Sequence, residues 1–386
     1  LNSDFLMQAE LVAIRHGETT TVPRYFTEPS PGQPNGAGGN MGPVLSQATH
    51  TPEQPHANEA LKVTVQASSA IAPVDQLQLR YRVQFGSEKT LNMQDTGQFG
   101  DVTAKDGIWT ATIPAQAAEA GELIRYYVTA TDTDGNSSRW PLYPESRDSE
   151  AYQGTTVIDP SIQSTLPVVQ LFIRNISAAN TSSGTRASLY YAGELYDNLH
   201  ISIHGQSSRG FPKKSYNLDF TSDHRFQYRP GERRVKDIRL MTNWGDKSRV
   251  RNALAYEMIQ QSGSLGHFSF QVRIQRNAEF FSIADMMEDG DDRWLERVGR
   301  NPDGALYKMY NNLGSASGNE KKTRRWEGTS DLQTLVSALS EGRSLAQRTH
   351  DAWDIIDLPQ TISYCVALAL CSSPSWSTEL PRRRRA

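Results

Sequence analysis

The chain has little cysteine and no long apolar run. Its 386 residues include two Cys, Cys365 and Cys371, both in the apolar run 362–371. Six positions apart on a helix, the thiols would face different directions, so we predict two buried thiols rather than a disulfide. No uninterrupted apolar stretch approaches the roughly 18 residues of a membrane span, and Leu1 opens no secretory leader. We expect a soluble piece of a longer protein.

An excess of charge of either sign is also missing. Forty Lys and Arg face 43 Asp and Glu, which gives a net charge of -3. Such a balance provides no global field that would favour nucleic acid or an anionic membrane. Any binding of anions must therefore be local.

Several catalytic signatures do not occur. The sequence has no HExxH, no CxxC and no GxSxG, which excludes the usual zinc peptidases, zinc ribbons and α/β hydrolases. It also lacks a Walker A motif and GxGxxG, the two familiar phosphate-binding patterns.

The length and the local composition predict several domains. We expect the end of a preceding β module and a Pro/Gly-rich linker in residues 1–55, a β domain in 56–160, an α+β domain in 161–371 and a divergent tail in 372–386. The linker is most evident at 29–40, which is dense in turn-forming residues. The fold class is thus a multidomain chain in which an all-β sandwich precedes an α+β domain.

Short alternating runs characterise residues 60–158. They lie at 61–65, 77–83, 107–113 and 123–130, and turns at 105–107 and 132–136 separate them. Strands of this length and spacing predict a sandwich of the immunoglobulin or fibronectin type III kind. The Asp-rich turns allow calcium binding, although such turns are more often simple hairpin chemistry.

Strands and helices mix after residue 165. Strands are predicted at 168–173, 199–203, 216–220, 237–241, 268–274 and 280–283, and helices at 246–259, 332–339, 345–353 and 358–370. For the first of these helices, Asp246 is the expected N-cap and Gly263 the expected stop.

The segment from His204 to Phe220, HGQSSRGFPKKSYNLDF, is the most informative part of the chain. A turn rich in Gly, Gln and Ser carries an Arg and two adjacent Lys between two alternating runs. Phosphate is well held by backbone N–H groups of such a turn together with a cation. The segment is therefore a candidate phosphate loop, and a solvated strand connection with incidental Lys is the alternative.

Three further candidates lie downstream. Lys308 ends the strand-like run 305–308, where an inward amine would approach a phosphate and an outward one would be an ordinary edge Lys. Glu257 lies near the apolar stripe of the first helix, as a carboxylate that orients a Lys would, although an exposed Glu is the simpler interpretation. The acidic run at 288–292 offers oxygen ligands for a magnesium or calcium ion but fits no EF-hand, so a solvated helix start is also possible.

Three ordered blocks give residues 166–371 a resemblance to the CotH kinase family, named for a bacterial spore coat protein. The first block is Ser207-Ser208-Arg209 with Lys213-Lys214-Ser215-Tyr216. The second is Asp246 to Ser248 with Arg251-Asn252-Ala253-Leu254-Ala255, and the third is Glu288, Asp291 and Trp294-Leu295 with Gly304 to Lys308.

The resemblance implies an atypical protein-kinase-like fold that transfers phosphate from ATP, with magnesium, to Ser or Thr of a protein substrate. It makes Arg209, Lys214 and Lys308 the ATP or phosphate contacts and Glu257 the carboxylate that orients a Lys. It also implies an extracellular or cell-surface location in a bacterial secreted protein.

One departure from the family pattern affects catalysis. The family's catalytic Asp residues lie beyond the position of Leu370, where this chain has a Ser- and Pro-containing stretch that ends in four Arg. The catalytic residues are therefore unknown, and we expect this truncated form to be inactive. The alternative function is a non-catalytic adhesion or carbohydrate-binding protein that uses its β-sandwich to bind polysaccharide.

Overall fold

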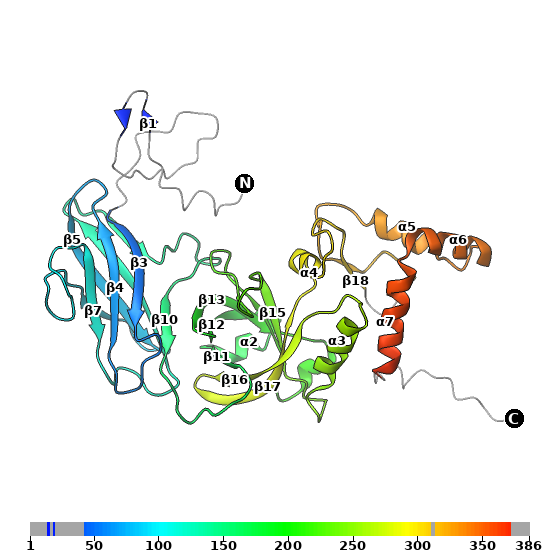
Figure 1. The fold of residues 1–386 in the computed structure, drawn as a ribbon, viewed down its shortest axis with the longest axis horizontal. Coiled ribbons are helices and arrows are strands. Elements are labelled where there is room, and N and C mark those ends of the chain that lie inside the picture. The colour runs from blue at the N-terminus through cyan, green and yellow to red at the C-terminus, as the bar shows by residue number, and fades with distance from the viewer. Residues whose placement is uncertain (1–13, 16–17, 20–41, 310–312, 372–386) are drawn as a thin grey trace. The chain divides into compact units, whose positions relative to one another are not determined.

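The computed structural model describes residues 14–15, 18–19, 42–309 and 313–371 (Figure 1). In the first of these ranges, a two-residue strand β1 (Ile14–Arg15) pairs with β2 (Glu18–Thr19). The rest of the predicted preceding module and the predicted linker at 29–40 lie outside the described residues, as does the tail 372–386.

Two antiparallel sheets make up the β module, residues 44–157. The first has the order β3-β4-β7, and the second has the order β10-β8-β5-β6, with β9 also paired to β8. The strands are β3 (Val44–Thr51), β4 (Leu61–Ser68), β5 (Val74–Val83), β6 (Lys89–Asn92), β7 (Ile108–Ile113), β8 (Leu123–Asp132), β9 (Ser137–Trp140) and β10 (Gln153–Thr156).

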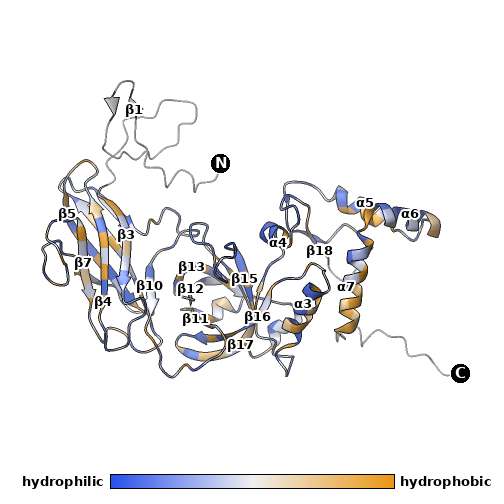
Figure 2. Cartoon of the chain, viewed as in Figure 1, coloured by the Kyte–Doolittle hydropathy of each residue, from blue (hydrophilic) through white to orange (hydrophobic). Residues whose placement is uncertain are grey.

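One apolar core joins the two sheets. Along β4 every second side chain is buried, and the same alternation in β8 turns its apolar residues inward. Val63 from the first sheet and Leu79 from the second belong to one buried cluster. Apolar and polar residues alternate along the strands of both sheets (Figure 2). The prediction of an all-β region is thereby confirmed. Its start needs correction, because the boundary after residue 55 falls between β3 and β4, which pair with each other.

Seven strands after the β module form a closed barrel in the order β11-β12-β13-β14-β15-β17-β16. Strand β11 pairs antiparallel with β12 and parallel with β16. The strands are β11 (Val168–Phe172), β12 (Thr185–Tyr191), β13 (Glu194–Ile203), β14 (Tyr216–Asp219), β15 (Asp237–Met241), β16 (Ser269–Arg276) and β17 (Glu279–Glu288).

Short helices accompany the barrel and follow it. They are α2 (Ile176–Ala179), α3 (Arg251–Gln261), α4 (Asp292–Arg297), α5 (Ser330–Ala338), α6 (Leu345–Ile355) and α7 (Leu358–Leu370). A two-stranded sheet of β18 (Tyr307–Lys308) and β19 (Glu320–Lys321) lies between α4 and α5 in the sequence. All four predicted helices are confirmed.

Two local predictions about these helices are wrong. Val250 rather than Asp246 is the N-cap of α3, because Asp246 instead accepts hydrogen bonds from the backbone of Ser248 and Arg251 within the preceding turn. The thiols are not buried either: Cys365 is exposed and Cys371 is half-buried, since α7 turns few of its apolar residues inward.

The chain divides into two compact units. The first comprises residues 1–203, 218–226 and 273–282, and the second comprises 204–217, 227–272 and 283–386. No helix in the described part of the chain is both long and apolar enough to cross a membrane.

Candidate functional site

The predicted phosphate loop connects the end of β13 to β14 and includes a 3-10 helix, η1 (Ser207–Gly210). Its two ends are held together by a hydrogen bond from the N–H of His204 to the carbonyl of Ser215, at 2.8 Å. Gly205 has a φ of +96°, and a Cβ there would lie 2.0 Å from the hydroxyl of Ser208. The tight turn therefore requires a glycine at this position.

The loop is anchored at its C-terminal end by two small polar residues. The buried hydroxyl of Ser215 accepts from the N–H of Thr242 at 3.0 Å, and the hydroxyl of Thr242 donates to the carbonyl of Lys213 at 2.9 Å. Thr242 directly follows β15, so the sheet fixes the position of this part of the loop. The tip of the loop is exposed.

Two of the predicted phosphate contacts lie together in this loop. Arg209 is exposed, and its Nε donates to the carbonyl of Gly205. Lys214 is half-buried, and its Nζ donates to the carbonyl of Arg209 at 2.6 Å. Both cations are thus held against backbone oxygens of one turn.

The other two predicted residues lie on separate elements. Lys308 is an exposed residue of β18, and its charge is close enough to lower the pKa of His204 at the base of the loop. Glu257 is exposed on α3, where its carboxylate accepts from the side-chain amide of Gln261 at 3.1 Å. The role predicted for each of the four residues stays a prediction.

A charged cluster that the sequence did not reveal lies around Asp289. This carboxylate is paired with Arg239 of β15 and with Lys322, whose Nζ is 2.7 Å away. Burial raises the pKa of Asp289, but the two cations outweigh this effect and hold the pKa below its usual range.

His204 connects the loop to this cluster. Its Nδ1 donates to the side-chain oxygen of Asn217 at 2.6 Å. Burial lowers the pKa of His204, and the charges of Arg239 and Lys308 lower it further. A neutral imidazole therefore lies among cations from β15 and β18 at the base of the loop. The alternating pattern of 237–241 could have pointed to Arg239, since Ile238 and Leu240 are buried on the opposite face.

The other acidic residues of the run 288–292 serve the local structure. Glu288 is paired with Arg297, and Asp292 with Lys236. Asp291 caps α4 by accepting from the N–H groups of Arg293 and Trp294. The interpretation as a helix start is confirmed for Asp291, whereas Glu288 is 2% exposed and is therefore not solvated.

A polar chain links the first turn of α3 to the barrel. The side-chain amide of Asn252 donates to the side-chain oxygen of Asn243 at 2.9 Å, and the amide of Asn243 donates to Asp285 Oδ2 at 2.6 Å. Asp285 is fully buried in β17, and its other carboxylate oxygen has no hydrogen-bond partner among the residues that the structure describes. Burial raises the pKa of Asp285 to about 6.

Within the described ranges, one group of acidic side chains brings its oxygen atoms within 4.8 Å of one another: Asp95, Asp101 and Asp106 in the β module. Asp95 accepts from the N–H groups of Asp106 and Gly107, and Asp101 accepts from that of Gly97. Hydrogen bonds across turns thus account for this group, as hairpin chemistry predicts.

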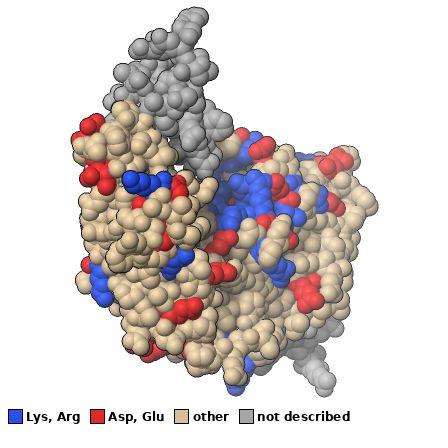
Figure 3. Space-filling model, turned by 60° about the vertical axis from the view of Figure 1, so that its left-hand side comes forward, with Lys and Arg blue, Asp and Glu red and all other residues tan. Residues whose placement is uncertain are grey.

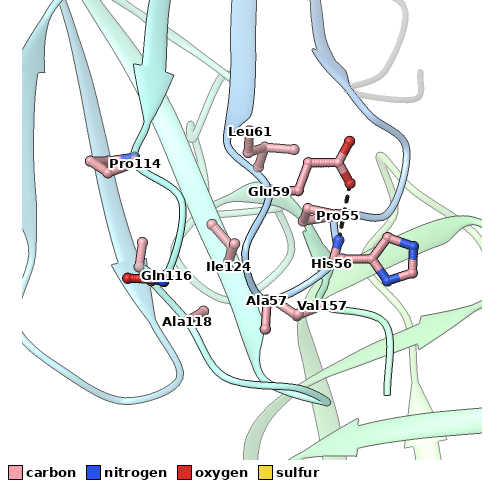
Figure 4. Close-up of a pocket in the computed structure, with 11 residues that line it drawn as sticks. Pro55, His56, Ala57, Glu59, Leu61, Pro114, Gln116, Ala118, Ile124 and Val157 are labelled. Atoms are coloured by element: carbon pink, nitrogen blue, oxygen red, sulfur yellow. Dashed lines mark hydrogen bonds between the residues drawn. The ribbon is translucent and has the colours of Figure 1, made fainter. Parts of the chain in front are cut away.

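Two further features are seen on the surface. A shallow hollow in the β module is lined mainly by small and apolar residues, and the N–H of His56 donates to Glu59 at its rim (Figure 4). On the face drawn in Figure 3, Lys and Arg side chains gather in a patch with acidic side chains among and around them, although the net charge is -3. Positive charge is therefore concentrated locally.

A mostly β chain whose C-terminal part combines a barrel, helices and a cationic loop is consistent with the predicted α+β domain. The model of the family described as CotH kinase protein matches residues 201–373. The resemblance is thereby confirmed for residues 201–373, which are similar to the CotH kinase family.

Other comparisons add little. No curated protein matches the chain significantly. Among solved structures, the crystal structure of Spo0M, a sporulation control protein from Bacillus subtilis, is similar at 10% identity with a TM-score of 0.20, over 52% of this chain and 73% of that one. At this TM-score the likeness supports no argument about fold or function.

Proposed function

We propose that residues 201–371 bind the triphosphate of ATP with magnesium and belong to a kinase that phosphorylates Ser or Thr of a protein substrate. The observation that carries the proposal is the cationic loop 204–215. It lies inside the family match, its ends are anchored to the sheet, and the charge of Lys308 reaches its base. Phosphoryl transfer depends on positioning and on stabilising phosphate charge, which such a loop supplies.

In this proposal Arg209, Lys214 and Lys308 contact phosphate oxygens and the fold is kinase-like. Magnesium would neutralise part of the triphosphate charge when it is bound. The β module would be an immunoglobulin- or fibronectin-like sandwich in a bacterial surface or secreted protein. Two sheets with one shared core support that classification.

The test is thermal unfolding of the full chain with and without millimolar magnesium and ATP. A ligand that binds only the folded state raises the melting temperature by mass action, by an amount equivalent to about 2.7 kcal/mol when the ligand is at 100 times its Kd. Adenosine alone, which lacks the phosphates, should give little shift. The absence of any shift with ATP would overturn the proposal.

Amino-acid substitutions test which residues contact the phosphates of ATP. Loss of a charged hydrogen bond to phosphate costs roughly 1.5–3 kcal/mol, so Arg209→Ala and Lys308→Ala should each weaken ATP binding by about 10- to 100-fold. Arg233→Ala is the matched control, since Arg233 forms an exposed ion pair with Glu296 outside the loop. Equal affinities in all three variants would exclude the assigned contacts. Incorporation of labelled phosphate into a Ser- and Thr-containing test protein then measures transfer.

A further inference from the structure

Strand β8 of the β module carries a partly buried cation, Arg125, that reaches two strands of the barrel. The guanidinium of Arg125 donates to Asp197 of β13 at 3.2 Å and to Ser188 of β12 at 3.3 Å. Ser188 also donates to Asp197 at 2.6 Å, and Asp197 is 3% exposed. A carboxylate taken this far out of water is stable only while its cation and hydrogen-bond donors remain in place.

A second group of contacts runs from the segment between β9 and β10. The carboxylate of Glu150 accepts from the N–H of Asp197 at 3.2 Å and bonds Nδ1 of His224 at 2.6 Å. The other ring nitrogen of His224 lies 3.4 Å from Glu194 of β13, and its ring stacks on Tyr196. The imidazole is thus held by the β module on one side and by the barrel strand on the other.

Apolar packing continues the same junction. Leu123 of β8 belongs to one buried cluster with Phe172 of β11 and Leu195 of β13. On the neighbouring strand, a Cβ at Gly154 would lie 2.1 Å from the carbonyl of Ile124, so β10 approaches β8 too closely for a side chain there. All of these residues belong to the first compact unit.

We propose that the β module and strands β11, β12 and β13 unfold as one cooperative unit, held by a junction network of Arg125, Ser188, Asp197, Glu150, His224 and Glu194. Domains within a chain usually meet through interfaces that permit relative motion. Here, separation of the β module from the barrel strands would expose the apolar cluster and leave buried charges without their partners. Strand β13 ends at Ile203, directly before the cationic loop. The β module is therefore bonded to the strand that leads into the candidate site.

The network is also sensitive to pH. Burial alone would lower the pKa of His224, but hydrogen bonds to Glu150 and Glu194 outweigh burial and raise the pKa to about 9. Because the folded value exceeds the ordinary value of 6.5, the stabilisation is fully present below pH 6.5 and is lost as the pH rises through about 9. The groups facing the imidazole are Glu150, Glu194 and Tyr196.

Hydrogen exchange of the full chain, followed peptide by peptide, tests the proposal. In Asp197→Asn, which keeps the shape of the side chain, amides of β4 and β8 should exchange faster by the same factor as those of β12 and β13, about 10- to 100-fold. Asp219→Asn is the control, because its exposed pair with His200 of β13 lies outside the network, and it should change little. Faster exchange confined to β12 and β13 would overturn the proposal.

A second measurement does not depend on whether Asp197→Asn folds. The wild-type chain, compared at pH 7 and pH 9.5 after correction for intrinsic exchange rates, should lose protection in β8, β10 and β13 together. His224→Gln should remove most of this pH dependence. Protection that stays constant with pH, or that is lost in β13 alone, would contradict the shared unit.

Discussion

The β module and the helices of the C-terminal region use apolar residues in opposite ways. In the module Val63, Leu77 and Leu79 are completely buried. The sequence of α7 is more apolar than that of any other helix of comparable length described (Figure 2). Nevertheless, Ile362 is 61% exposed and Leu370 is 68% exposed. An apolar sequence therefore predicts the helix, but it does not predict how much of the helix is buried.

Buried charges contribute part of the stability of the second unit. In the second unit, Glu288 is paired with Arg297, Asp289 with Arg239 and Lys322, and Asp285 is hydrogen-bonded through Asn243. A core held by apolar contacts tolerates changes of pH, whereas one held by ionisable groups does not. Four substitutions separate these two ways of stabilising the fold.

Removal of the cation beside Glu288 should lower the free energy of unfolding most. Arg297→Ala removes the guanidinium from a carboxylate that is 2% exposed, while the N–H of Phe268 still donates to it at 2.8 Å. Breaking a buried pair in this way costs about 3–5 kcal/mol of unfolding free energy, measurable by urea denaturation. The exposed pair offers the control, since Arg233→Ala should cost about 1 kcal/mol or less. Equal losses in the two variants would show that Glu288 is solvated.

A cavity in the β module should have the second-largest effect on the free energy of unfolding. Leu79→Ala removes a fully buried side chain from the shared core of the two sheets and should cost about 2–5 kcal/mol, with no dependence on pH between 5 and 8. Denaturant titrations at both pH values measure this. A loss that varies with pH would mean that ionisable groups also stabilise this core.

The pKa of Asp285 makes a pH-dependent prediction for the second unit. A folded pKa raised from 3.8 to about 6 favours folding below pH 3.8, and this contribution is lost as the pH rises through 6. At about 1.4 kcal/mol per pKa unit, the loss reaches up to about 3 kcal/mol at neutral pH. Asp285→Asn should therefore gain stability relative to wild type between pH 4 and pH 7. A constant difference between the two chains over this range would show that the carboxyl titrates normally.

A substitution on α7 should change the free energy of unfolding least. Leu370→Ala removes an exposed side chain and should change the unfolding free energy by no more than about 0.5 kcal/mol, in contrast to Leu79→Ala. The same urea titrations provide the comparison. A cost near that of Leu79→Ala would mean that Leu370 is covered in solution.

Local periodicity determined most elements. The runs at 237–241 and 358–370 match β15 and α7, because alternation and helical spacing are properties of a few adjacent residues. The sequence places residues 44–51 in the preceding module and linker, because their own pattern is weak. Their pairing with β4 is what makes them strand β3. The N-cap of α3 was misplaced because several polar residues precede the helix and only their backbone geometry selects among them.

The amino-acid sequence was enough to indicate an all-β region before a mixed one, the cationic loop, and the similarity of residues 201–373 to the CotH kinase family. Only the tertiary structure decided which charges meet. Arg239 and Lys322 converge on Asp289, and Arg125 reaches Asp197, across separations of 33 to 72 residues. Pairing over such distances depends on strand order and burial, and no local pattern encodes either.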